Sequence, residues 1–151
     1  TMALFEAQLI LPCTQREVFD FLLRPANVAL ISPPEQGLYF VDAPEIVTQG
    51  TRLKFRIQVF GQVQEGEHEI TSIVDDTRII ESQVKGVLKS WVHDHLFETN
   101  SNGEVVVTDR IEFEPPGGVL GLLVTKNRVL DQLEDAFEHR YVRMKKLLAK
   151  K

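Results

Sequence analysis

The sequence predicts an α+β domain in which one strand and two short helices precede a run of antiparallel strands and a long C-terminal helix. Polar and apolar residues alternate over most of residues 38–114, and Asp, Asn and Gly residues separate the alternating segments. From residue 130 onward, apolar residues recur at spacings of three and four, which is typical of an amphipathic helix. The length of 151 residues, 43% of them hydrophobic, fits one domain with a substantial core, which we place at residues 2–151.

The first segment, residues 4–11, alternates between apolar and polar side chains and is predicted to be a half-buried strand. Residues 14–17, Thr-Gln-Arg-Glu, then form a capping box, in which Thr14 and Glu17 satisfy each other's backbone N–H groups. This box predicts a short helix that runs to about Leu23. Pro25 interrupts it, and a second brief helical turn follows at residues 26–31.

The middle of the chain predicts consecutive strands, because each alternating segment is followed by turn residues and no helical segment lies between them. Asp75 and Asp76, and residues 100–103, are the clearest hairpin turns, since Asp, Asn and Gly tolerate the backbone angles of tight turns. The predicted strands are residues 38–42, 51–61, 62–74, 78–85, 89–99 and 104–114.

The last segment is predicted to be a long amphipathic helix. Two prolines and two glycines at residues 115–118 end the preceding strand. The apolar face of the helix is predicted to comprise Leu130, Leu133, Phe137, Tyr141, Met144 and Leu148. The opposite face carries charged residues and is predicted to contact solvent.

Composition and charge exclude several classes of function. The net charge of −5 and the pI near 5.4 argue against nucleic-acid binding, which usually requires a basic surface. No stretch of 18 consecutive apolar residues predicts a membrane span, and no signal-peptide pattern occurs at the N-terminus. The single cysteine, Cys13, is consistent with a reducing compartment, so we expect a cytoplasmic protein.

Residues 89–99 hold the most informative pattern of the chain. Trp91, His93, His95 and Phe97 alternate with other residues, so all four side chains are predicted to point to one face of the sheet. In the next strand Asp109 is the polar exception on an apolar face. If the inward-facing residues of both strands share one face of the sheet, the residue numbers of each opposed pair add up to about 202 or 204. This register places Asp109 opposite His93 or His95.

Three interpretations of these polar residues remain open at this point. The histidines are buried core groups that need hydrogen bonds, or they orient the polar end of a ligand in an apolar pocket, or they act as acid and base. The third interpretation makes His93, His95 and Asp109 the catalytic residues of an enzyme. No recognisable nucleophile motif accompanies them. A His-x-His pair supplies two metal ligands, but no third ligand follows at diagnostic spacing, so we predict no metal site. His68 is interpreted as structural unless a cavity lies beside it.

The order of the predicted elements and three local motifs resemble the SRPBCC superfamily, also called START-like or Bet v-like. The motifs are Trp91-Val92-His93-Asp94-His95-Leu96-Phe97, the pair Asp109-Arg110, and the segment at residues 116–121, Pro-Gly-Gly-Val-Leu-Gly. Within that superfamily the chain looks most like small bacterial proteins with a Trp-x-His-x-His-x-Phe strand. The resemblance covers nearly the whole chain.

The resemblance implies a helix-grip fold, in which a curved antiparallel sheet of seven strands wraps around the C-terminal helix and leaves a cavity between them. It implies binding of a small hydrophobic or lipid-like molecule, with no cofactor. The alternatives are an acid/base enzyme of the polyketide cyclase or dehydratase type and a protein-interaction module with a closed cavity, and the oligomeric state stays open. The expected ligand-binding residues are Phe55, Ile57, Trp91, His93, His95, Phe97, Asp109, Ile111, Phe113, Leu130, Leu133, Phe137 and Tyr141.

Overall fold

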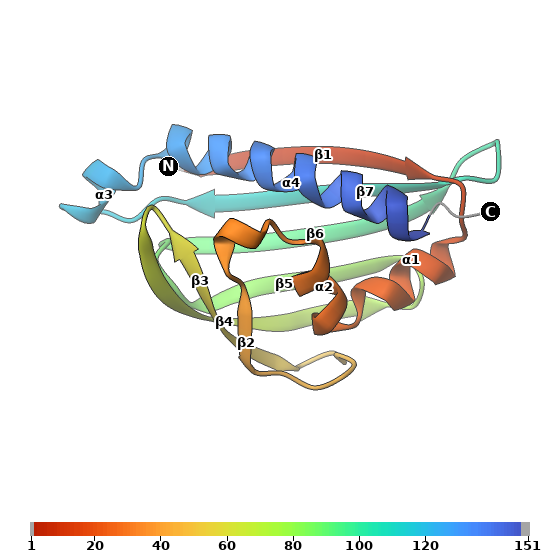
Figure 1. Ribbon diagram of the computed structural model, residues 1–151, viewed down its shortest axis with the longest axis horizontal. Helices are drawn as coiled ribbons and strands as arrows, with labels where there is room; N and C mark the ends of the chain where they lie inside the picture. The colour runs from red at the N-terminus through yellow and green to blue at the C-terminus, as the bar shows by residue number, and fades with distance from the viewer. Residues whose placement is uncertain (1, 149–151) are drawn as a thin grey trace.

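The computed structural model describes residues 2–148 and contains the predicted succession of elements (Figure 1). No helix within these residues is long and apolar enough to cross a membrane. The strands are β1 (Ala3–Leu11), β2 (Tyr39–Asp42), β3 (Arg52–Val59), β4 (Gln62–Val74), β5 (Arg78–Lys85), β6 (Ser90–Thr99) and β7 (Val105–Glu114). The helices are α1 (Gln15–Leu22), α2 (Pro25–Ile31), the 3-10 turn η1 (Pro34–Gln36), α3 (Leu120–Leu123) and α4 (Lys126–Leu148).

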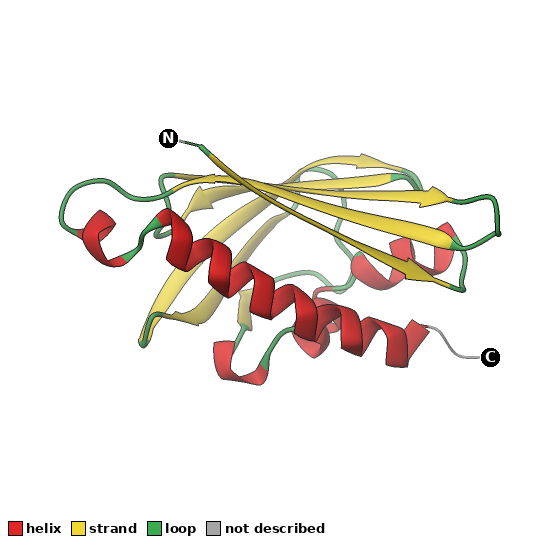
Figure 2. Ribbon diagram, turned by 90° about the horizontal axis from the view of Figure 1, so that it is seen from above, coloured by secondary structure: helices red, strands yellow, loops and turns green. Residues whose placement is uncertain are grey.

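All seven strands form one antiparallel sheet in the order β1-β7-β6-β5-β4-β3-β2. Strands β2 to β7 follow one another as a meander, whereas β1 pairs with β7, so that the first strand of the chain lies beside the last. Helix α4 runs along one face of the curved sheet, and α1 and α2 lie near its C-terminal end (Figure 2). The structure therefore has the predicted seven-stranded sheet and long C-terminal helix.

The local predictions for the N-terminal third are confirmed within one residue. Thr14 accepts a bond from the backbone N–H of Glu17, and a Glu17 carboxylate oxygen accepts one from the backbone N–H of Thr14, at 3.1 and 2.9 Å. Two short elements, η1 and α3, were not predicted, because segments of three and four residues are too short to show a helical period.

The turn at residues 100–103 sets the register of the β6–β7 hairpin. Asn100 accepts bonds from the backbone N–H groups of Asn102 and Glu104, and Gly103 has a φ of 78°, which favours glycine. The hairpin then pairs His95 with Asp109. The two residue numbers add up to 204, which is one of the two predicted registers.

Two apolar clusters fill the space between the sheet and the helices. One lies under α1, α2 and the C-terminal part of α4, and it contains Phe19, Ile31, Phe97, Val107 and Met144 among others. The other lies under the N-terminal part of α4 and contains Ile111, Phe113, Val129, Leu133 and Phe137. Polar residues of the central strands occupy the positions between the two clusters, and they form the candidate site.

Candidate functional site

A row of polar side chains crosses the inner face of the sheet between the two apolar clusters. The polar residues of β6 and β7 lie between the two clusters. Phe97 on β6 and Val107 on β7 belong to the first cluster, and Ile111 on β7 belongs to the second. We call this row the polar belt. Its members are His68 on β4, Glu81 on β5, His93 and His95 on β6, Asp109 on β7, and Tyr141 on α4.

Asp109 is the centre of the belt and has no exposed surface. One of its oxygens, Oδ1, lies 2.8 Å from Nε2 of His93, and the other, Oδ2, accepts a bond from the Tyr141 hydroxyl at 2.6 Å. Oδ1 also lies 3.2 Å from Nδ1 of His95, at ion-pair distance but not aligned for a hydrogen bond. The predicted contact between Asp109 and the histidines is therefore present, and Tyr141 joins α4 to it.

The belt continues from His95 to the far side of the sheet through Glu81. Nε2 of His95 lies 3.8 Å from Oε1 of Glu81, and Nδ1 of His68 lies 2.6 Å from Oε2 of the same carboxylate. Glu81 was not predicted as a site residue. Its signal was present, because β5 directs Ile79, Glu81 and Gln83 to one face, and a carboxylate beside a buried isoleucine needs a partner.

The two histidines of β6 have opposite charge preferences. Burial, together with the charge of neighbouring His95, lowers the pKa of His93 to about 4 against the pull of Asp109. Burial also acts to lower the pKa of His95, but the carboxylates of Asp109 and Glu81 outweigh it and raise that pKa above the ordinary value. The rings are stacked, with centroids 3.6 Å apart, so two positive charges would repel strongly. We conclude that His95 binds a proton more readily than His93, and that His93 is neutral at pH 7.

The carboxylates of the belt are ionised. Burial acts to raise the pKa of Asp109, but its contacts with His93 and His95 hold that pKa well below the usual range. Glu81 behaves in the same way, with His68 and His95 outweighing burial. Burial and then the charge of Asp109 raise the pKa of Tyr141, so this hydroxyl keeps its proton and acts as a donor.

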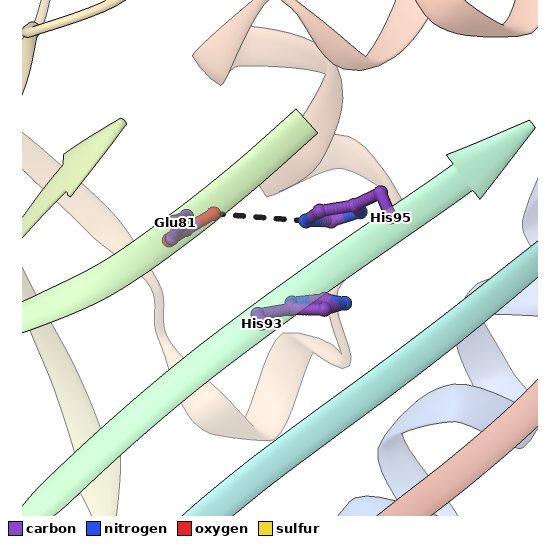
Figure 3. A group of neighbouring side chains, drawn as sticks. All are labelled: Glu81, His93 and His95. Carbon is purple, nitrogen blue, oxygen red and sulfur yellow. Dashed lines mark ion pairs between the residues drawn. The ribbon is translucent and has the colours of Figure 1, made fainter. Parts of the chain in front are cut away.

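Glu81, His93 and His95 are the three groups of the described chain that come close enough for a shared metal ion (Figure 3). Each offers a ligand atom within 4.8 Å of the others. Glu81 supplies the third ligand that sequence spacing did not reveal. However, the imidazole planes are only 24° from parallel, so their lone pairs do not converge on one point as tetrahedral coordination requires. A metal ion would need one ring to leave the stack.

Arg140 is a second functional candidate, besides Glu81, that the sequence analysis missed. It lies on α4 next to Tyr141, and its guanidinium carbon is 5.1 Å from the centre of the Phe137 ring. Its Nε and Nη2 atoms are buried, and neither has a hydrogen-bond partner among the described residues. The spacing offered a signal, since Arg140 follows Phe137 by three residues and precedes Met144 by four, which places it beside the buried face of the helix.

Two cavities lie on opposite sides of the polar belt. The larger, which we call the Trp91 chamber, has a volume of about 190 Å³. Trp91 lines it, and its buried indole N–H has no partner among the described residues. Its other lining residues include Phe55, Ile57, His68, Val87, Leu88, Val124, Val129, Leu133 and Ala136.

The smaller cavity, which we call the Arg140 chamber, has a volume of about 100 Å³. Glu81, His93, His95 and Arg140 provide its polar wall. Its apolar wall comprises Leu22, Pro25, Val28, Phe40, Val47, Leu53, Ile70 and Ile79. The bond between His68 and Glu81 forms part of the partition, because His68 lines the Trp91 chamber and Glu81 lines the Arg140 chamber.

The expected ligand-binding residues divide between these chambers and the core. Phe55, Ile57, Trp91 and Leu133 line the Trp91 chamber, whereas His93 and His95 line the Arg140 chamber. The remaining seven line neither, and they are Phe97, Asp109, Ile111, Phe113, Leu130, Phe137 and Tyr141. His68 was interpreted as structural in the absence of a cavity, and the structure places it beside one.

Comparison with known proteins identifies the fold. No protein-family model matches the chain, and no curated protein matches it in sequence. Among solved structures, the major latex-like protein 151 from Panax ginseng superposes with a TM-score of 0.66 at 21% identity, covering 93% of this chain and 96% of that one. Protein CV1439 from Chromobacterium violaceum superposes with a TM-score of 0.71 at 14% identity, covering 98% of both chains.

The di-domain ARO/CYC protein StfQ from the steffimycin biosynthetic pathway is also similar. Its TM-score is 0.74 at 14% identity, and the match covers 95% of this chain but 49% of StfQ. Identities this low establish a shared fold and leave activity open. Together with the sheet order and the position of α4, these similarities show that the chain has the helix-grip fold of the Bet v-like proteins.

Proposed function

We propose that this protein binds a small hydrophobic molecule in the Trp91 chamber. The observation that carries the proposal is a largely apolar cavity with one buried, unpartnered donor, the indole N–H of Trp91. Ligand sites commonly combine an apolar wall with a few polar groups that fix orientation. A ligand with an acceptor atom near Trp91 would satisfy the indole, whose burial without a partner costs about 1 to 3 kcal/mol.

The volume of the chamber limits the size of the ligand. A cavity of about 150 Å³ holds one benzene molecule, and the Trp91 chamber is somewhat larger at about 190 Å³. It therefore suits a substituted aromatic molecule of one or two rings, or a short alkyl chain with a hydroxyl or carbonyl group. This size favours a small hydrophobic molecule over a long lipid chain. The open volume also favours ligand binding over an interaction module with a closed cavity.

Trp91 gives a direct measurement, because it is the only tryptophan of the chain. We expect 2-naphthol, used as an aromatic probe with one hydroxyl, to quench or shift the Trp91 fluorescence in a saturable way. Ala136 lines the chamber from α4, so Ala136→Phe should fill the space and abolish the response. Val142→Phe on the same helix is the control, since Val142 is 50% exposed and lines neither chamber.

Two results would contradict the proposal. If the quenching of Trp91 fluorescence in the wild-type protein does not saturate as the concentration of 2-naphthol rises, the chamber does not bind the probe. Equal binding by Ala136→Phe and the wild type would place the probe elsewhere. Native mass spectrometry of protein purified gently from its source would then identify the natural ligand, as a mass that is lost when the protein is denatured.

The second candidate function is acid/base catalysis by His93, His95 and Asp109. The chain of contacts from Tyr141 through Asp109 to His93 favours it, because a carboxylate fixes the tautomer and orientation of an imidazole. A base with a pKa of about 4 is weak at neutral pH, and this argues for binding over catalysis. If the cluster is catalytic, His93→Ala and His95→Ala should abolish conversion of a bound molecule, as measured by mass spectrometry, and leave its binding intact.

A further inference from the structure

We propose that the Arg140 chamber is a second ligand site, which binds the carboxylate of a small apolar acid through the guanidinium group of Arg140. This site is separate from the Trp91 chamber and does not depend on the function proposed for it. The proposal rests on two buried guanidinium nitrogens of Arg140 that have no partner among the described residues, on the charges that face the chamber, and on the size and polarity of its wall.

Arg140 differs from three arginines at the surface of the protein that each contact a carboxylate. Arg52 reaches Glu69 at 3.0 Å, Arg78 reaches Asp94 at 3.0 Å, and Arg110 reaches Glu6 at 2.8 Å. Arg140 has no carboxylate within ion-pair distance among the described residues, although its Nε and Nη2 atoms are buried. A buried charge without a partner is strongly unfavourable, so such a group normally binds a counter-ion.

The position of Arg140 is fixed by its neighbours on α4. The next residue, Tyr141, anchors the helix to β7 through its 2.6 Å bond to Asp109. One turn earlier, Phe137 supports the guanidinium with its ring face. Both contacts hold the guanidinium at the wall of the chamber, so a ligand would meet a donor group that is already ordered.

The charges around the chamber select a single negative charge. Arg140 attracts anions and opposes a metal cation, while ionised Glu81 and Asp109 oppose a second negative charge such as that of a phosphate monoester. A carboxylate carries one charge, and its two oxygens match the fork of a guanidinium group. His95 lines the same wall and offers a second donor.

The rest of the chamber fits a short apolar body. Leu22, Val28, Leu53, Ile70 and Ile79 face the polar wall. The volume of about 100 Å³ is two-thirds of the ~150 Å³ that holds benzene, so the ligand must be smaller than benzene, such as an acid of about three carbon atoms. Propionate has this size and charge, and 1-propanol has the same carbon skeleton without the charge.

Isothermal titration calorimetry with these two compounds tests the proposal. We expect the wild-type protein to bind propionate at least about tenfold more tightly than 1-propanol, because only the acid pairs with Arg140. Arg140→Met should weaken binding of propionate by about ten- to a hundredfold and should leave thermal stability unchanged or raised, since it removes a charged group whose buried nitrogens have no partner among the described residues. Lys145→Met is the control, because it removes an exposed positive charge from the same helix.

The stability measurement separates a binding residue from a structural one. If Arg140→Met lowers the melting temperature and binding of propionate persists, Arg140 is structural and the proposal is wrong. Arg140→Lys keeps the charge and loses the fork, so it should weaken binding even if the Met variant does not fold. Equal affinity of the wild type for acid and alcohol, or no binding of either, would also overturn the proposal. Ala136→Phe fills only the Trp91 chamber, so it should bind propionate normally and thereby distinguish the two sites.

Discussion

Asp109 connects more of the protein than any other residue of the polar belt. It contacts His93 and His95 on the neighbouring strand and Tyr141 on α4, and it is completely buried. Removing it leaves the imidazole of His93 and the hydroxyl group of Tyr141 without their acceptor in the interior. Loss of one partner from such a buried set is far more costly than loss of a surface ion pair.

We therefore expect Asp109→Ala to lower the free energy of unfolding by about 3 to 5 kcal/mol, as measured by urea denaturation. Asp94→Ala is the matched control on β6. Asp94 points to the opposite face and pairs with Arg78, whose side chain is 41% exposed, so its loss should cost about 1 kcal/mol or less. Similar losses in both variants would contradict the central position of Asp109 in the belt.

The stacked histidines predict a specific dependence of stability on pH. The folded state holds the pKa of His93 at about 4, compared with about 6.5 in an unfolded chain. As pH falls from 6.5 to 4, the unfolded state therefore takes up this proton first, and His93 alone lowers the free energy of unfolding by about 3 kcal/mol. His95 acts in the opposite direction, because its raised pKa gives stability below that pKa which is lost as pH rises through it.

NMR titration of the imidazole resonances checks this prediction at each residue. His93 should titrate near pH 4 and His95 above 6.5, and His93→Gln should flatten the fall in stability between pH 6.5 and 4. The charged groups that face these rings are Glu81 from β5, Asp109 from β7 and Arg140 from α4. Titration of both histidines near 6.5 would show that the rings are hydrated and do not interact.

Among the elements, the strands were the most predictable because a half-buried strand alternates in sequence as it does in space. The turn at residues 100–103 fixed the β6–β7 register to one of two values, and the structure selects the one that pairs His95 with Asp109. The helix was harder. Its rotation depends on the bond between Tyr141 and Asp109, a contact between residues 32 positions apart, and this rotation turns Arg140 inward. For this reason the sequence analysis did not include Arg140, which is close to Glu138 and Arg143 in the sequence, among the site residues.

The close packing of β3 against β4 gives a prediction for the Trp91 chamber. Gly66 lies opposite Phe55 in the register, and a Cβ atom at residue 66 would lie 2.5 Å from Cζ of the Phe55 ring. Gly66→Ala must therefore displace this ring, which lines the chamber. We expect binding of 2-naphthol to weaken several-fold and the free energy of unfolding to fall by about 1 to 3 kcal/mol.

Gly117→Ala provides the comparison for this experiment. A Cβ atom at residue 117 would meet no atom within 4 Å, and its φ is not in the left-handed region, so we expect little change in binding or stability. If Gly66→Ala binds 2-naphthol as the wild type does, then Phe55 either moves without entering the chamber or does not contact the probe.

At the scale of the whole molecule, the polar belt divides the interior into two chambers. The sequence predicted the helix-grip fold and one cavity lined by thirteen residues. It could not predict the division, because the division arises where side chains from four strands and α4 meet across the belt. His68 and Glu81 lie 13 positions apart and on different strands, and their contact depends on the β4–β5 register. That register contains two irregularities, which alternation in the sequence does not reveal.

The pairing of β1 with β7 also has a consequence for the order in which the protein is made. Residue 3 pairs with residue 113, so the first strand emerges from the ribosome more than a hundred residues before its partner. At about 5 to 20 residues per second this interval lasts roughly 5 to 20 s. During that time the apolar side chains of β1 that will face the core, such as Leu9 and Leu11, have no sheet to join. Strand β1 is therefore exposed to aggregation and to chaperone binding during this interval, and the exposure ends when β7 completes the sheet.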